Sequence, residues 1–133
     1  VGIAVAQIRA AVTMLLPRLK FATDVHPDDA SSQFPVGVIR TITAAAAEAV
    51  RNSKRHAGPD ATVVVSAHAV AGNLRVEIAD NGAGFDVSAL PGDRMGVLGS
   101  IRGRMDQLAG AEAEIISVIG RGTVVRLSWT APS

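Results

Sequence analysis

The sequence predicts an α/β fold, a two-layer sandwich in which a mixed β-sheet of about five strands is covered on one face by about three helices. Two observations predict it. Short segments whose apolar side chains alternate with polar ones are typical of strands with one buried face, and longer segments whose apolar side chains recur every three or four positions are typical of amphipathic helices. Both kinds are interspersed along 133 residues, which is long enough for one domain with its own core.

Composition excludes several classes of partner and site. The formal net charge of +1 gives no indication of binding to nucleic acid or to an anionic membrane. Because the chain has no cysteine, it has no disulfide framework and no cysteine-based metal site. No apolar run reaches the roughly 20 residues that a membrane span requires, so we expect no direct membrane contact. The chain begins Val1-Gly2-Ile3, without an initiator methionine or a basic signal region, which is typical of a piece of a longer protein.

The first segment predicts a helix over residues 3–16, ended by Pro17. Two placements are open for this helix: it packs on this domain, or it belongs to a neighbouring domain. Residues 18–25 then alternate as a strand, and residues 26–32 are predicted to form a polar loop.

The longest helix is predicted from Pro35 to about His56. Proline suits the first turn, four consecutive alanines favour the helix, and a Gly-Pro pair ends it. At about 100° per residue, its side chains fall on three faces. The apolar face, expected in the core, consists of Ile39, Ile42, Ala46, Ala49 and Val50. The face expected to point to solvent consists of Arg40, Ala47, Arg51 and Lys54.

The third face of this helix carries Glu48, Asn52, Arg55 and His56 within an arc of about 100°. An acid, an amide and two bases in one line can hold a metal ion and a polyphosphate. Amide and acid oxygens suit a hard cation such as Mg²⁺, and arginine suits phosphate oxygens. The alternative is a solvated helix face with i,i+4 pairs, in which His56 is a cation near the helix C-terminus.

Residues 61–69 and 74–80 predict two further strands. The second strand places Asp80 on the same face as its apolar residues, so this carboxylate is expected to point inward, where it needs a hydrogen-bond donor. Gly82 and Gly84 follow, and because they have no Cβ their backbone can approach a ligand closely. An inward acid beside exposed backbone could bind a flat heterocycle with an amino group, such as adenine. The alternative is an Asn-Gly hairpin turn.

Residues 85–95 are expected to be a loop, placed like a lid between two candidate ligand-binding elements. Residues 96–109 begin with glycines and become helical. Gly96, Gly99 and Ser100 are expected around the helix N-terminus, where free N–H groups attract phosphate. The alternative is that glycine and serine only cap the helix.

The last two strands, residues 112–118 and 123–129, are predicted to form a hairpin through a Gly-Arg-Gly turn. Thr123 opens the last strand beside two glycines. It either faces a phosphate or is an ordinary turn residue.

Four of these segments, in this order, resemble the motifs of the ATP-binding catalytic domain of sensor histidine kinases. That Bergerat-type fold is shared with gyrase, a heat-shock chaperone and a mismatch-repair ATPase. Residues 48–56 look like the N box, residues 80–85 like the first glycine box, residues 96–105 like the second glycine box, and residues 120–127 like the terminal Gly-x-Gly-Thr strand. The resemblance covers roughly residues 18–130.

The resemblance implies a role for each matching residue. Asn52 would coordinate Mg²⁺, and Glu48 would be catalytic and polarise the acceptor or a water. Arg55 and His56 would touch phosphates, and Asp80 would bind the adenine amino group. The implied cofactor-binding residues are, in full, Asn52, Arg55, His56, Asp80, Gly82, Gly84, Gly96, Gly99, Ser100 and Thr123.

Particular sequence features refine the resemblance. The short lid and the run Arg-Gly-Arg-Met at residues 102–105 are most similar to the nitrate-sensor type of bacterial kinase. The second glycine box departs from the usual Gly-x-Gly-Leu, because residues 95–100 read Met-Gly-Val-Leu-Gly-Ser. If residues 102–105 fix the register, Val97 and Ser100 stand where glycines are usual; if Gly96 and Gly99 are the phosphate glycines, their spacing differs by one. The acceptor histidine of the family has a His-Asp or His-Glu context on a separate helical hairpin, and His26, His56 and His68 do not match it.

The resemblance therefore implies a histidine kinase domain that binds Mg-ATP or ADP. It would transfer the γ-phosphoryl group to a histidine on a separate dimerisation domain of the same protein, with a response regulator as indirect partner. Two other functions stay open: a degenerate binding module of the same fold, and an anti-sigma-factor serine kinase. Residues 1–17 would be an N-terminal helix and a candidate linker from the dimerisation domain, and residues 18–133 the catalytic domain. The expected location is cytoplasmic, either free or as the cytoplasmic part of a membrane-bound sensor.

Overall fold

The computed structural model describes residues 2–16, 19–25, 34–70, 72–86 and 92–132. The predicted loop at residues 26–32 lies outside them. The described residues form a five-stranded sheet and three helices, which confirms the predicted sandwich. None of these helices is both long enough and apolar enough to cross a membrane. The elements in chain order are α1 (Gly2–Leu15), β1 (Lys20–Val25), α2 (Val36–His56), β2 (Val63–Val70), β3 (Asn73–Asp80), α3 (Gly92–Asp106), β4 (Ala111–Val118) and β5 (Gly122–Thr130).

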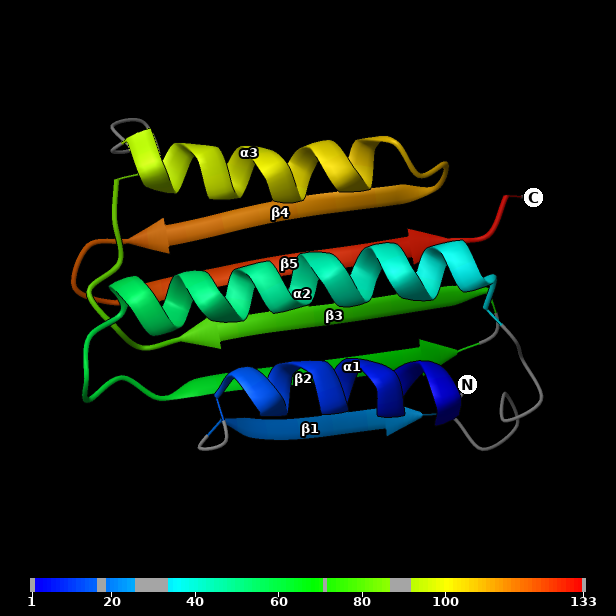
Figure 1. Ribbon diagram of the computed structural model, residues 1–133, viewed down its shortest axis with the longest axis horizontal. Helices are drawn as coiled ribbons and strands as arrows, with labels where there is room; N and C mark the ends of the chain where they lie inside the picture. Colours follow the sequence, from blue (N-terminus) through cyan, green and yellow to red (C-terminus); the bar gives the residue numbers. More distant parts are fainter. Residues whose placement is uncertain (1, 17–18, 26–33, 71, 87–91, 133) are drawn as a thin grey trace.

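The sheet is mixed and has the strand order β1-β2-β3-β5-β4. β1 runs parallel to β2, and the other neighbouring pairs are antiparallel. Figure 1 shows the three helices on one side of this sheet. β3 is central, and its last residue, Asp80, lies opposite Val63 of β2 and Thr123 of β5. The chain then leads to α3 rather than to a paired strand, so the Asn-Gly hairpin alternative is wrong.

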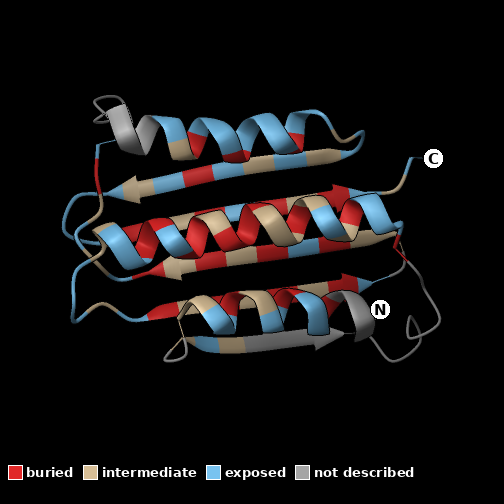
Figure 2. Ribbon diagram, in the orientation of Figure 1, coloured by how far each residue is buried: buried red, intermediate tan, exposed pale blue. Residues whose placement is uncertain are grey.

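The core lies between the helix layer and the inner face of the sheet (Figure 2). β3 alternates as predicted, with Leu74, Val76 and Ile78 at most 1% exposed. Most of the predicted apolar face of α2 is buried, and Trp129 of β5 is buried with it. The site residues described below are therefore held by elements whose opposite sides are fixed in one core.

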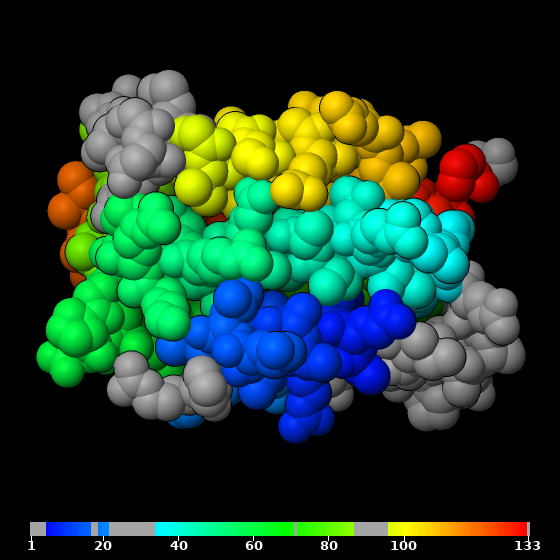
Figure 3. Space-filling view, viewed as in Figure 1, coloured from blue at the N-terminus to red at the C-terminus, as the bar shows by residue number. Residues whose placement is uncertain are grey.

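α1 packs on this domain, which is one of the two placements expected from the sequence. Val5, Ile8 and Val12 belong to the same core as α2 and the sheet, and the Nζ of Lys54 on α2 donates to the carbonyl oxygen of Leu15 at 3.2 Å. Figure 3 shows α1, α2 and α3 packed side by side. Ala47, predicted to face solvent, is buried instead. The prediction was wrong because α1 covers that side of α2, which the sequence of α2 alone does not reveal.

α3 begins at Gly92, four residues before the predicted start. Residues 92–95 were predicted as loop, and that prediction was wrong; residues 87–91 of the predicted lid lie outside the described residues. Leu98, Ile101 and Met105 are at most 4% exposed and attach the helix to the core. Helices in proteins are stabilised more by such packing than by propensity. α3 therefore begins before Gly96 and continues through Gly96 and Gly99, which were predicted to lie at its start.

The outer face of the sheet is polar where three strands carry charges in one row. Arg126 of β5 donates to Glu77 of β3 at 2.8 Å and to Glu114 of β4 at 2.9 Å. The hydrogen bond to Glu77 is the largest cause of a raised pKa for the Arg126 guanidinium. The row ties the central strand to the edge strand on the face that no described helix covers.

Gly122, at the turn into β5, is expected to be required for stability. Gly122 has a φ of +112°, and an added Cβ would overlap the carbonyl oxygen of Asp80. We expect Gly122→Ala to destabilise the protein by at least about 2 kcal/mol, because both the backbone strain and the overlap oppose it. The measurement is urea unfolding. The matched control is Gly103→Ala in α3, where a Cβ meets nothing within 4 Å and alanine should stabilise the helix by about 0.5–1 kcal/mol. Equal stability of Gly122→Ala and wild type would contradict this geometry.

Candidate functional site

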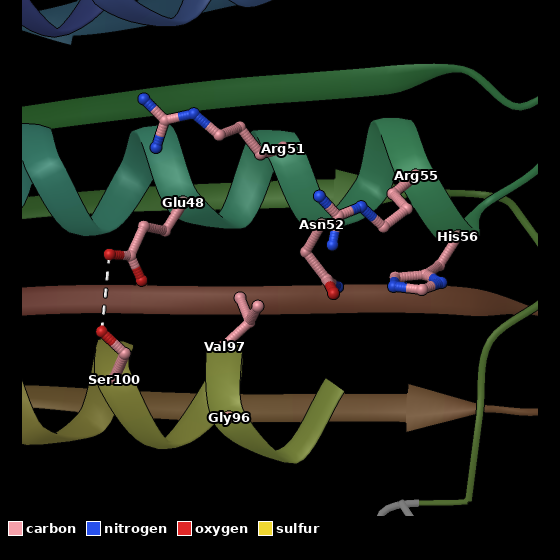
Figure 4. A pocket seen from close by; sticks show the side chains of 8 residues that line it. All are labelled: Glu48, Arg51, Asn52, Arg55, His56, Gly96, Val97 and Ser100. Carbon is pink, nitrogen blue, oxygen red and sulfur yellow. Dashed lines mark hydrogen bonds between the residues drawn. The ribbon is translucent and has the colours of Figure 1, made fainter. Parts of the chain in front are cut away.

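The predicted polar face of α2 lines a cavity of about 370 Å³ between α2 and α3. A volume of this size is typical of a small-molecule site. Glu48, Asn52, Arg55 and His56 contribute from α2, and Figure 4 shows the side chains of Glu48, Asn52 and His56 extending toward α3. Arg51, which was predicted to face solvent, is exposed and also lines the cavity. From α3 the lining residues are Gly96, Val97 and Ser100.

Asn52 is the buried polar group of this cavity. Its residue is only 5% exposed, and its Oδ1 has no hydrogen-bond partner among the described residues. A buried acceptor without a partner costs about 1–3 kcal/mol, so it is uncommon in a folded protein. An oxygen held in this way suits a hard cation such as Mg²⁺, which keeps several waters and takes few protein ligands. The described residues contain no cluster of three His, Cys, Asp or Glu side chains that could hold a metal by themselves.

Glu48 connects the two helices that form the cavity. Its Oε1 accepts a hydrogen bond from the guanidinium of Arg104 at 2.8 Å and from the hydroxyl of Ser100 at 3.4 Å. The Glu48 side chain is 18% exposed and that of Arg104 46%, so the pair is partly desolvated and charge-assisted. Arg104 was not among the predicted site residues. Its partner Glu48 lies on another helix, so no pattern within α3 shows that the two side chains meet.

Asp80 points inward, as the alternation of β3 predicted, and is 8% exposed. Its Oδ2 accepts from the hydroxyl of Ser53 at 2.7 Å. Its Oδ1 accepts from the backbone N–H of Gly82 at 3.0 Å and of Thr123 at 3.3 Å. The buried carboxylate was expected to need a hydrogen-bond donor, and three donors contact it. Ser53 and its role were missed, because the sequence places Ser53 on α2 without showing which strand it meets.

Asp80 also lines a second, much smaller cavity of about 10 Å³. The residues that line it are Asn52, Ser53, His56, Ala57, Asp80, Gly84, Phe85 and Thr123. Asn52 and His56 line both cavities, so the two adjoin. About 10 Å³ is at the lower limit for a single water molecule. A heterocycle can therefore reach the Asp80 carboxylate only if the walls of this cavity move apart.

Packing within the fold explains why residues 82 and 84 are glycines, whereas the sequence pattern predicted the close approach of a ligand. An added Cβ on Gly82 would overlap the backbone of Ala57 at the end of α2. On Gly84, which has a φ of +64°, it would overlap the carbonyl oxygen of Val118. Both glycines thus allow the loop after β3 to pack between α2 and the hairpin. Gly84 still lines the small cavity, so a second role toward a ligand stays a prediction.

Gly96, Gly99 and Ser100 are not at the start of a helix. They are the fifth, eighth and ninth residues of α3, whereas only the first four N–H groups of a helix lack an intrahelical partner. The prediction that free N–H groups of these residues face a phosphate is wrong for this structure, because the helix starts earlier. Gly96 and Ser100 do line the large cavity, and Gly99 is exposed.

Over residues 37–133 the sequence matches the family described as histidine kinase-, DNA gyrase B- and HSP90-like ATPase. No curated protein sequence gives a match. Several solved structures have the same fold at low sequence identity.

The histidine kinase domain of the blue-light activated histidine kinase from Erythrobacter litoralis EL346 has 22% identity and a TM-score of 0.65, covering 95% of this chain and 58% of that one. The mycobacterial sensor histidine kinase MprB has 14% identity and a TM-score of 0.65, covering 99% and 97%. The catalytic domain of histidine kinase ThkA has 15% identity and a TM-score of 0.69, covering 96% and 94%. This chain thus spans little more than half of the first of these structures.

These likenesses show the fold, and the match over residues 37–133 shows the family. They do not confirm the nitrate-sensor type, which stays a prediction. With its mixed sheet, its three covering helices and the cavity between α2 and α3, the chain belongs to the histidine kinase-, DNA gyrase B- and HSP90-like ATPases.

Proposed function

We propose that this chain is the ATP-binding catalytic domain of a two-component sensor histidine kinase. It binds Mg-ATP and transfers the γ-phosphoryl group to a histidine on a separate dimerisation domain of the same protein. The observation that carries the proposal is the pair of adjoining cavities: a large one lined by two arginines, a histidine and Asn52, and a small one that ends at the buried carboxylate of Asp80.

The large cavity takes the polyphosphate. Arg55 and His56 are placed to contact phosphate oxygens, and Arg51 adds a third basic group to the lining. Asn52 supplies an oxygen to Mg²⁺, and the bound ion contributes neutralisation of phosphate charge. Phosphoryl transfer depends mostly on positioning and charge neutralisation, so a cradle of few residues is sufficient. Gly96 and Ser100 border the phosphates from α3, and Gly99 lies near them.

The small cavity takes the adenine ring. A carboxylate has about four lone-pair sites, and protein donors use three of those of Asp80. The remaining site accepts one N–H of the adenine amino group. Thr123 stands beside Asp80 in the same wall, and Gly82 and Gly84 belong to the loop that closes over the ring.

Glu48 acts on the acceptor rather than on the nucleotide. Both of its hydrogen bonds to α3 use Oε1, so Oε2 can accept a proton from the acceptor histidine or polarise a water. The acceptor belongs to the dimerisation domain, because His26, His56 and His68 lie outside the sequence context of an acceptor. From that histidine the phosphoryl group passes to a response regulator.

A second candidate function is a degenerate module of the same fold that works through protein contacts. The observation that favours it is the position of Gly96 and Gly99 inside α3, which leaves their N–H groups bonded within the helix rather than free for phosphate. Titration of the chain with ADP and ATP, with and without Mg²⁺, separates the two functions. A kinase domain binds these nucleotides, so an absence of binding would favour the degenerate module.

Asp80→Asn should lower the affinity for ADP roughly tenfold or more, because one buried polar contact is worth about 1–3 kcal/mol. The affinity for GDP, which lacks the 6-amino group, should fall far less. Isothermal titration calorimetry measures both, and Asp106→Asn at the exposed end of α3 is the matched control. An equal loss for both nucleotides would mean that Asp80 is only structural.

Asn52→Ala should remove most of the gain in ATP affinity that Mg²⁺ gives, while binding without Mg²⁺ stays within about twofold, because the lost oxygen contacts the ion. Asn52→Asp keeps an oxygen ligand there and should retain the gain. Titrations with and without Mg²⁺ measure the effect. If Asn52→Ala leaves the Mg²⁺ dependence at the wild-type level, the ion is held elsewhere.

Glu48→Gln should slow transfer to the acceptor hairpin by roughly 10²–10⁴-fold, with less than about a twofold change in ATP affinity, since the carboxylate acts on the nucleophile. Radiolabelled ATP with the hairpin added in trans measures acid-labile phosphohistidine. The isolated chain should stay unlabelled because it lacks the acceptor. Robust labelling of the isolated chain would overturn this, and tight ATP binding with no labelling of any mixture would favour the degenerate module.

A further inference from the structure

Ser117 of β4, which neither the motifs nor the proposed function uses, is the centre of three polar contacts. Its Oγ accepts the backbone N–H of Phe85 at 2.9 Å. It also lies 3.2 Å from the carbonyl oxygen of Gly122 and 2.8 Å from the Oγ1 of Thr123. The side chain is partly buried, and it bridges the loop after β3 to the start of β5.

Only one assignment of hydrogens satisfies all three contacts. A serine hydroxyl has one hydrogen and two lone pairs. The carbonyl oxygen of Gly122 can only accept, so Ser117 must donate its hydrogen there. The contact between Ser117 and Thr123 then requires that Thr123 is the donor. Ser117 is thereby saturated, with the N–H of Phe85 and the O–H of Thr123 on its two lone pairs.

Thr123 consequently has no hydrogen left for a ligand, and its Oγ1 can only accept. Thr123 is 6% exposed and lines the small cavity together with Asp80. Asp80 is likewise an acceptor, because Ser53 and two backbone N–H groups already donate to its carboxylate. The two functional groups that the cavity offers from β3 and β5 are therefore both acceptors.

We propose that Ser117 is a positioning residue that fixes the Thr123 hydroxyl as an acceptor, so that the base subsite selects a purine with an amino group at position 6 over one with an oxo group. The proposal rests on the proposed function, since it assumes that the base occupies the small cavity. An exocyclic amine has two N–H groups, which match the two acceptors. On the side of β3 and β5 an oxo group would meet acceptors only, and a site that leaves polar groups unpaired rejects such an analogue strongly.

The test compares ADP with IDP, which differ in carrying an amino or an oxo group at position 6 of the base. Isothermal titration calorimetry without Mg²⁺ gives the preference as the ratio of the two dissociation constants. Ser117→Ala releases the Thr123 hydrogen, which can then donate to the oxo group, so the preference for ADP should fall roughly tenfold. Ser117→Thr keeps a hydroxyl in a strand position and should retain the preference for ADP. Ser128→Ala, on β5 and lining a different cavity, is the matched control.

A double-mutant cycle with Thr123→Val separates this role from a merely structural one. Thr123→Val removes the hydroxyl, so it should lower the preference by itself, and adding Ser117→Ala to it should change the preference by less than about twofold. If Ser117→Ala alone does not fold, Thr123→Val beside Thr123→Ser still tests the same hydroxyl.

The outcomes distinguish a failure of the role of Ser117 from a failure of the proposed function. A wild-type chain that prefers ADP, with a Ser117→Ala variant that keeps the full preference, would overturn the role of Ser117 and leave the proposed function standing. Retention of the preference by Thr123→Val would do the same. A folded wild-type chain that binds neither nucleotide would overturn the proposed function and this assignment with it.

Discussion

The buried carboxylate of Asp80 constrains three parts of the chain at once. Its hydrogen-bond donors come from α2 through Ser53, from the loop after β3 through Gly82, and from the start of β5 through Thr123. A carboxylate at 8% exposure is stable only if such donors are present. The end of α2, the loop and the last hairpin must therefore converge on the end of β3. The same convergence creates the small cavity, so the proposed base subsite and the packing of the fold have one physical origin.

The large cavity has a different origin, because it lies between two helices rather than at the end of a strand. α2 is held on one side by α1, where Lys54 donates to the carbonyl oxygen of Leu15, and on the other by α3, where Arg104 pairs with Glu48. The pair at Glu48 is partly exposed and contributes little stability by itself. Its consequence is geometric. It fixes the carboxylate of the proposed catalytic residue against α3 and sets how the polar face of α2 is presented to the cavity.

How far the sequence predicts this arrangement depends on how local the cause is. The inward direction of Asp80 follows from the period of one strand, and the common face of Glu48 and Asn52 follows from the pitch of one helix. Both were predicted. Ser53 lies 27 residues from Asp80, and Phe85 lies 32 residues from Ser117. Those contacts depend on which elements meet, which no local period encodes. The burial of Ala47 was missed for the same reason, since it requires α1 to lie against α2.

The glycines show why one residue type can be interpreted correctly in one segment and wrongly in another. At Gly84 and Gly122 a Cβ would overlap a carbonyl oxygen and φ is positive, so the backbone of this fold requires glycine. At Gly96 and Gly99 a Cβ would meet nothing within 4 Å, and the backbone is helical. Alanine there would favour the helix by about 0.5–1 kcal/mol, so neither packing nor backbone conformation explains these two glycines. Gly96 lines the large cavity, which leaves a ligand, not the fold, as the physical reason to examine at that position, and the nucleotide titrations address that reason directly.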